Sequence, residues 1–136
     1  MKHYFVDTNV VIDLLANREG YAESAAYLFD AAERKEIHLS VCALSYANIY
    51  YILRKRIGNK NAIAALSDLS EYVSILPVNE SIIQQALHSD FSDFEDAIQY
   101  YAASQDSSVS AIITRNKKDF RSSKILVLSP AEWLAI

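Results

Sequence analysis

The sequence contains little cysteine, glycine or proline, and it has no long apolar run. Its single cysteine, Cys42, excludes an internal disulfide and any zinc site built from several thiolates. Two glycines and two prolines, with 51% hydrophobic residues, exclude fibrous and disordered chains and indicate a compact, helix-rich globule. No apolar run approaches the roughly 18 residues that cross a bilayer, and the amino terminus lacks a signal-peptide pattern. We therefore expect a cytoplasmic protein with no membrane partner.

Length and charge limit the organisation further. A chain of 136 residues suits one domain with a single sizeable core, so we expect one domain over residues 1–136. The formal net charge is −4, which argues against extensive nonspecific coating of DNA. Nucleic acid is not excluded as a partner, because a bound metal ion can recruit phosphate to carboxylates.

The stretch at residues 2–15, KHYFVDTNVVIDLL, organises the chain. Its apolar run at residues 4–6 is typical of a strand buried on both faces of a parallel sheet, and it stops at Asp7. Apolar residues then recur at helical spacing, with Thr8 or Asn9 suited to cap the helix. Ligands of open parallel sheets bind beyond the carboxyl ends of the strands, so Asp7 is well placed for chemistry. The alternative is that Asp7 is only an additional helix cap.

Strand-like and helix-like segments alternate along the rest of the chain, which is typical of the α/β class. Ser92 with Glu95, and Ser129 with Glu132, have the form of capping boxes that open helices. Gly58 is placed to end a helix. The predicted strands are residues 4–6, 37–41, 73–78, 110–114 and 125–128, and the predicted helices after the first are residues 21–35, 43–56, 60–72, 79–87, 92–101 and a short one from 130.

Further polar residues stand where predicted elements begin or end. Asp96 lies in the first turns of the predicted helix 92–101, and Asn116 and Asp119 follow the strand 110–114. Asn116 and Asp119 share a sheet edge with Asp7 if the two strands are parallel neighbours, and three distant segments of the chain then converge on one pocket. Such oxygen ligands suit a hard cation that keeps several waters, Mg²⁺ or Mn²⁺, and not zinc. The alternative is an ordinary surface distribution of acids, with some of them interacting with helix dipoles.

Four motifs resemble the PIN-domain family of Mg²⁺-dependent ribonucleases, and especially the VapC-type toxins of bacterial toxin–antitoxin pairs. They are VDTNVVIDLL at residues 6–15, LSVCALSYANIYYILRK at 39–55, DFEDAIQYYAA at 93–103 and AIITRNKKDF at 111–120. The first and last motifs are the most specific. The resemblance implies a three-layer α/β/α sandwich around a small parallel sheet of four or five strands. It also implies an acidic pocket, RNA as substrate, a cognate antitoxin and a homodimer.

The family pattern can be carried over residue by residue. It implies that Asp7, Asp96 and Asn116 bind the metal, with Asp119 nearby, and that Thr8 and Thr114 support the pocket. One position departs from the pattern, because the family's second acid, a glutamate in the middle helix, falls on Asn48. An asparagine can bind a metal or its water through the amide oxygen, but the pocket loses one charge. The resemblance therefore predicts weakened or lost catalysis.

The expected mechanism is hydrolysis of an RNA phosphodiester by a metal-activated water. Asp7 and Asp96 hold one Mg²⁺ or two, and Asn116 and Asn48 fix coordinated water. Asp119 either orients that water or is a solvated loop acid. The candidate contacts to the RNA backbone, which also serve solubility, are Arg54, Lys55, Arg56 and Lys60 in one cluster and Arg115, Lys117 and Lys118 in another.

Two alternatives from other classes stay open at this point. In the first, the domain is a catalytically weakened PIN-like module whose acidic pocket binds a partner protein or nucleic acid without cleavage, and Asn48 marks the loss. In the second, it is a receiver-type or phosphatase domain. The second fits less well, because DTNVV lacks the additional acid or lysine that such a site requires around its aspartate.

Overall fold

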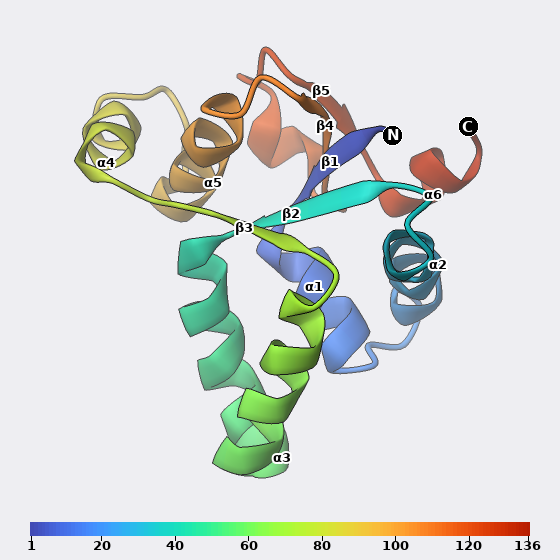
Figure 1. The fold of residues 1–136 in the computed structure, drawn as a ribbon. Helices are drawn as coiled ribbons and strands as arrows, with labels where there is room; N and C mark the ends of the chain where they lie inside the picture. Colours follow the sequence, from blue (N-terminus) through green and yellow to red (C-terminus); the bar gives the residue numbers. More distant parts are fainter.

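The computed structural model describes residues 1–136 and contains one five-stranded sheet in which all neighbouring strands are parallel. The order across the sheet is β3-β2-β1-β4-β5, so the amino-terminal strand is central (Figure 1). The strands are β1 His3–Val6, β2 His38–Cys42, β3 Ser74–Leu76, β4 Val109–Ile113 and β5 Leu126–Leu128. All five predicted strands are therefore confirmed within a few residues at each end.

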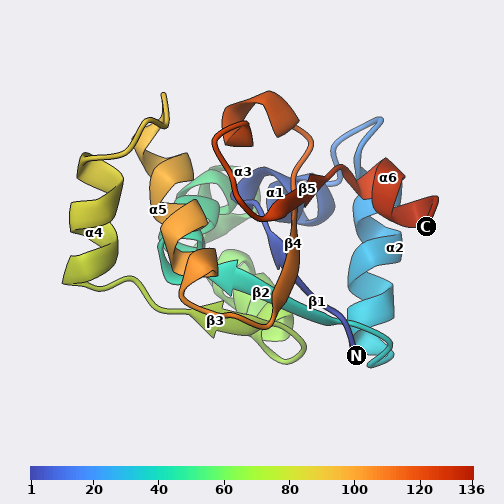
Figure 2. The same cartoon turned by 90° about the horizontal axis from the view of Figure 1, so that it is seen from above.

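Helices cover both faces of the sheet, which confirms the expected three-layer α/β/α sandwich (Figure 2). Helices α1, α2 and α3 pack on one face, and α4 and α5 pack on the other with the 3-10 turn η1. Their bounds are α1 Thr8–Leu15, α2 Ala22–Glu33, α3 Ala43–Ser70, α4 Glu80–Leu87, α5 Phe94–Ser104, η1 Lys117–Phe120 and α6 Pro130–Leu134. No helix is both long enough and apolar enough to cross a membrane.

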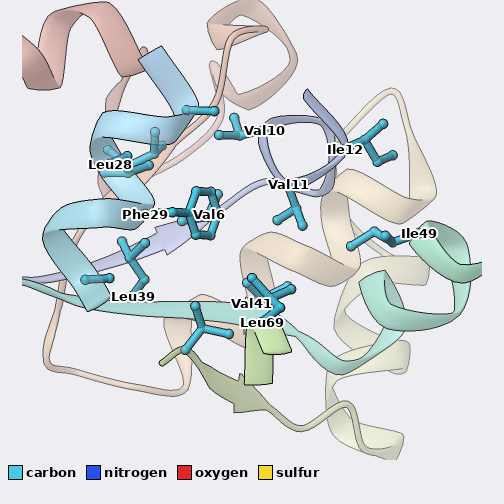
Figure 3. Packing of buried hydrophobic residues seen from close by; sticks show 14 of the residues in the cluster. Val6, Val10, Val11, Ile12, Leu28, Phe29, Leu39, Val41, Ile49 and Leu69 are labelled. Atoms are coloured by element: carbon cyan, nitrogen blue, oxygen red, sulfur yellow. The ribbon is translucent and has the colours of Figure 1, made fainter. Parts of the chain in front are cut away.

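The central strand supplies both hydrophobic cores, because successive side chains of a strand point to opposite faces. Val6 packs against α1 and α2, whereas Phe5 packs toward α5 on the other face, and both are fully buried. Figure 3 shows Val6 with Val10 and Val11 of α1 and with Phe29 of α2. Burial on both faces explains the unbroken apolar run of β1 and leaves Asp7 as the first polar residue after it.

Helix α3 is broken at Gly58, where φ is +82° and the backbone is not helical. Figure 1 shows the two arms of α3 folding back on each other at this end of the molecule. A residue with a Cβ is disfavoured at this φ, which explains the glycine. The break confirms the predicted end of one helix near residue 56 and the start of another near residue 60.

Two of the predicted helix caps are wrong. Asp93, not Ser92, caps α5, since its carboxylate accepts from the backbone N–H of Asp96 at 3.0 Å. At α1 the capping position is Asp7 itself, and its side chain makes no capping hydrogen bond. The capping box of Ser129 is confirmed. Because the chain enters α5 one residue later than predicted, its glutamate at position 95 is not used as a cap.

Candidate active site

Asp7 lies at the carboxyl end of β1, in the middle of the sheet. Its backbone N–H donates to the carbonyl of Ile113 at 2.9 Å, which ties it to the end of β4. The residue is only 2% exposed. Parallel neighbours end at the same sheet edge, so β1 and β4 bring the two most specific sequence motifs together, as predicted.

Two neutral side chains hold the carboxylate of Asp7. Thr114, directly after β4, donates its hydroxyl to Oδ2 at 2.8 Å, and Gln99 of α5 donates its side-chain amide to Oδ1 at 3.0 Å. Burial raises the pKa of Asp7, and these two hydrogen bonds partly offset that rise. The side chain is thus fixed in orientation, and its carboxylate forms no ion pair.

Asp13 of α1 shows the contrasting case. It is equally buried, but Arg115 donates to both of its oxygens, at 2.8 and 3.2 Å. The guanidinium also lies 4.4 Å from the ring centre of Tyr21. Arg115 is therefore engaged in a two-pronged ion pair and an aromatic contact, which is not the free phosphate-binding side chain that the sequence suggested.

Asp96 is half-buried in the first turn of α5. Burial, followed by the negative charges of Asp7, Asp93, Asp119 and Glu95, raises the pKa of Asp96 to about 7. None of the five ion pairs in the chain includes Asp7 or Asp96. The site thus gathers negative charge without neutralising it, which is the electrostatic condition of a cation-binding pocket.

The turn after β4 joins the site through Thr114. Its hydroxyl oxygen accepts from the backbone N–H of Asn116 at 3.1 Å while it donates to Asp7. Asp119, in η1, donates its backbone N–H to the carbonyl of Asn116 at 3.0 Å, and its charge acts on Asp96. The buried ring of Phe120 anchors this turn in the core beside α5. The structure thus brings Asn116 and Asp119 to the edge where they were expected.

Gln99 is the residue that the sequence reasoning missed. It is 4% exposed, and its side-chain oxygen accepts from the backbone N–H of Thr8 at 3.1 Å and from the Thr8 hydroxyl at 3.2 Å. The Thr8 hydroxyl also lies 2.5 Å from that of Ser45 in α3. One glutamine therefore links β1, α1 and α5. A polar residue three positions after Asp96, inside an apolar helix face, was the available signal.

Asn48 does not donate to Asp7 or Asp96. Its side-chain amide donates to a carboxylate oxygen of Glu95 at 3.2 Å, across the gap between α3 and α5. Asn48 was predicted to contact the metal or its water, and in the structure its side chain instead contacts Glu95, the neighbour of Asp96 in the sequence.

The basic residues proposed from the sequence divide into two groups. Lys117 pairs with Glu132 at 3.0 Å, in addition to the engagement of Arg115 with Asp13. The guanidinium carbon of Arg54 lies 6.0 Å from the ring centre of Tyr50 and 5.9 Å from that of Tyr51. Five of the proposed cations are exposed and form no ion pair, which leaves them available for phosphate contacts: Arg54, Lys55, Arg56, Lys60 and Lys118.

The donor set of the site fits a hard cation that keeps much of its water. Asp7, Asp96 and Asn116 offer carboxylate and amide oxygens, with no thiolate and no imidazole among them. No group of three or more His, Cys, Asp or Glu side chains is spaced to enclose a metal ion. Mg²⁺ is commonly bound by one or two carboxylates and several waters, whereas structural zinc requires about four protein ligands. The residues therefore fit Mg²⁺ or Mn²⁺.

The raised pKa of Asp96 predicts a pH-dependent stability. Between its unfolded pKa near 4 and its folded pKa of about 7, the folded chain binds more protons, so the free energy of unfolding falls as pH rises. Asp96→Asn removes this dependence. We expect its melting temperature to match that of the wild type near pH 4 and to exceed it by about 3–6 °C at pH 7.5.

Calorimetric scans of both proteins across this range, without divalent metal, measure the difference. A constant offset at every pH would show that Asp96 does not titrate in this way.

Comparisons with known proteins agree with this geometry. A family model described as the PIN domain matches residues 3–118. No curated protein sequence matches the chain. Among solved structures, a toxin–antitoxin complex from Klebsiella pneumoniae contains a similar chain, with a TM-score of 0.69 at 22% identity, covering 93% of this chain and 97% of that one.

Two further structures share the fold. VapBC-1 from nontypeable Haemophilus influenzae matches with a TM-score of 0.67 at 22% identity, over 95% of this chain and 98% of that one. The sarcin–ricin-loop-cleaving toxin VapC20 of Mycobacterium tuberculosis matches with a TM-score of 0.63 at 19% identity, over 80% of this chain and 86% of that one. At identities this low the matches show a shared fold, and any conclusion about the reaction must be argued from the residues of the site.

Proposed function

Since the chain belongs to the PIN-domain family, we propose that it is a Mg²⁺- or Mn²⁺-dependent endoribonuclease and the toxin of a toxin–antitoxin pair. The observation that carries the proposal is the pair of carboxylates, Asp7 and Asp96, gathered at one sheet edge without a cationic partner. Uncompensated buried charge costs stability, so its presence at the ligand-binding edge of a parallel sheet favours a function.

Asp7, Asp96 and Asn116 are the residues that would hold the metal. When bound, a divalent ion supplies a positive charge for the phosphoryl oxygens and lowers the pKa of a bound water. Gln99 and Thr114 orient the Asp7 carboxylate toward its place in the site. We assign to Asp119 the positioning of the attacking water. Hydrolysis then joins the water oxygen to phosphorus, and the departing ribose oxygen takes up a proton.

The RNA contacts proposed are Arg54, Lys55, Arg56, Lys60 and Lys118. These exposed cations have no carboxylate partner, whereas Arg115 and Lys117 are already paired. Phosphate contacts of this kind add affinity without reading sequence, and salt weakens them. Arg115 and Lys117 would contact RNA only after giving up their ion pairs with Asp13 and Glu132, so we assign them a secondary role in RNA binding.

The proposed partners are a cognate antitoxin and a second copy of this chain. Support for an antitoxin comes from the toxin–antitoxin complexes among the structural neighbours, including those of Klebsiella pneumoniae and nontypeable Haemophilus influenzae. An acidic pocket of this kind also suits an arginine or lysine side chain from an inhibiting partner.

Incubation of the purified chain with a mixed RNA pool tests the function. We expect cleavage with Mg²⁺ or Mn²⁺ that stops with EDTA, because two like-charged carboxylates cannot organise the site without a cation. A chain with Asp96→Asn serves as the negative control. Absence of metal-dependent cleavage across varied RNA pools, together with tight binding of RNA or a partner, would support the non-catalytic module instead.

A further inference from the structure

Glu95 precedes Asp96, one of the proposed metal ligands, in the sequence, and it neither caps its helix nor forms an ion pair. It occupies the second position of α5, next to Asp96, and Asp93 rather than Glu95 completes the cap of that helix. Glu95 forms no ion pair. Its carboxylate accepts one side-chain hydrogen bond, from Asn48 at 3.2 Å.

The contact with Asn48 orients this carboxylate from a second helix. Asn48 and Glu95 are 47 residues apart, so the hydrogen bond exists only because α3 and α5 both reach the same end of the sheet. An asparagine amide donates hydrogen bonds and carries no charge, so Asn48 can hold a carboxylate close to Asp96 without neutralising it. A lysine or arginine there would cancel the charge.

We propose that Glu95 adds a third acidic charge at the solvent-facing rim of the cation-binding pocket, where it acts on the ion through bound water and not as a ligand, and that Asn48 is the positioning residue which orients it. This inference rests on the proposed metal site. Glu95 is exposed while Asp7 is buried, so Glu95 supplies its charge at the solvent side of the pocket, where a hydrated ion keeps its waters. Position 48 thereby contributes to the site through another side chain and not through its own oxygen.

The alternative is that Glu95 has no role in cation binding and only interacts with the dipole of α5, as acids in a first helical turn commonly do. The chain offers a matched control for this, because Glu23 is an exposed glutamate at the second position of α2. Glu23→Gln and Glu95→Gln each remove one charge from equivalent helical positions. A dipole effect predicts the same result for both.

Titration calorimetry with Mn²⁺ on wild type, Glu95→Gln and Glu23→Gln tests the inference. We expect Glu95→Gln to weaken Mn²⁺ affinity by about fivefold to tenfold, the size of one charge acting on a dication through several ångströms of water. Glu23→Gln should leave the affinity unchanged. Melting temperatures measured without metal should differ little between the two variants, since both positions are exposed.

The double variant Asn48→Glu with Glu95→Gln exchanges the charge between the two helices. The new glutamine can donate to the new glutamate, so the hydrogen bond persists with the carboxylate on α3. We expect this exchange to recover most of the Mn²⁺ affinity that Glu95→Gln loses.

Asp7→Asn separates failure of this inference from failure of the metal site. If Asp7→Asn abolishes Mn²⁺ binding while Glu95→Gln binds like the wild type, Glu95 is outside the pocket and the inference is overturned with the site intact. If Asp7→Asn also binds like the wild type, the metal site itself is wrong. Equal losses in Glu95→Gln and Glu23→Gln would likewise overturn the inference in favour of a dipole effect.

Discussion

Asp7→Asn is expected to abolish metal binding and RNA cleavage while making the protein more stable. The substitution removes a buried charge that only neutral donors hold, so we expect a gain of about 1–2 kcal/mol in the free energy of unfolding without metal. Mn²⁺ affinity should fall by roughly 100-fold, equivalent to about 2.7 kcal/mol, because the most enclosed anionic ligand is lost. Cleavage should fall at least as far.

The geometry of the pocket allows an asparagine without collapse. The amide oxygen can keep the hydrogen bond from Gln99, and the amide N–H can donate to the hydroxyl of Thr114, which is able to accept as well as donate. Loss of function in Asp7→Asn would therefore reflect chemistry and not misfolding.

Asp13→Asn is the matched control for this prediction. Asp13 is as buried as Asp7, but it neutralises Arg115, so its substitution should lower stability by about 1–3 kcal/mol and leave Mn²⁺ affinity unchanged. The two variants should thus move the melting temperature in opposite directions. Unaltered Mn²⁺ affinity in Asp7→Asn, or parallel destabilisation in both variants, would contradict the assignment of Asp7 as a ligand.

Gln99→Leu is the second substitution with a large expected effect. Leucine is similar in size but removes the donor to Asp7 and the acceptor for the backbone of Thr8. Loss of a residue that orients a metal ligand typically costs about 10- to 100-fold in metal affinity, and we expect a loss in that range. The Asp7 pKa should rise further without this hydrogen bond, so half-maximal Mn²⁺ binding should occur at higher pH than in the wild type.

Mn²⁺ titrations at several pH values distinguish this positioning role from simple destabilisation. A purely structural effect would lower the melting temperature without moving the pH at which binding is half-maximal. Gln84→Leu, at an exposed position of α4, controls for a glutamine-to-leucine change away from the site. A pH midpoint identical to that of the wild type would exclude a role for Gln99 in setting the charge state of Asp7.

The sequence alone determined the α/β architecture and the place of its central acid. An apolar run followed by Asp7 and then by helical spacing is a local pattern, and a strand buried on both faces needs no distant information to be recognised. The same is true of the break at Gly58 and the capping box at Ser129, where a conformational preference or a hydrogen bond spans only a few residues. The location of Asn116 and Asp119 near Asp7 could be predicted because the carboxyl ends of neighbouring parallel strands lie at the same edge of a sheet.

Only the tertiary structure decided which side chains face one another. Arg115 follows Asp13 by 102 positions, and Gln99 follows Asp7 by 92 positions, so neither contact is visible in local spacing. Burial settles these pairings, since a polar group removed from water must find a partner and the nearest one belongs to another element. Because Asp93 and not Ser92 caps α5, the side chain of Glu95 is not used in the cap and accepts a hydrogen bond from Asn48 instead. No periodic pattern in the sequence indicates this contact between two helices.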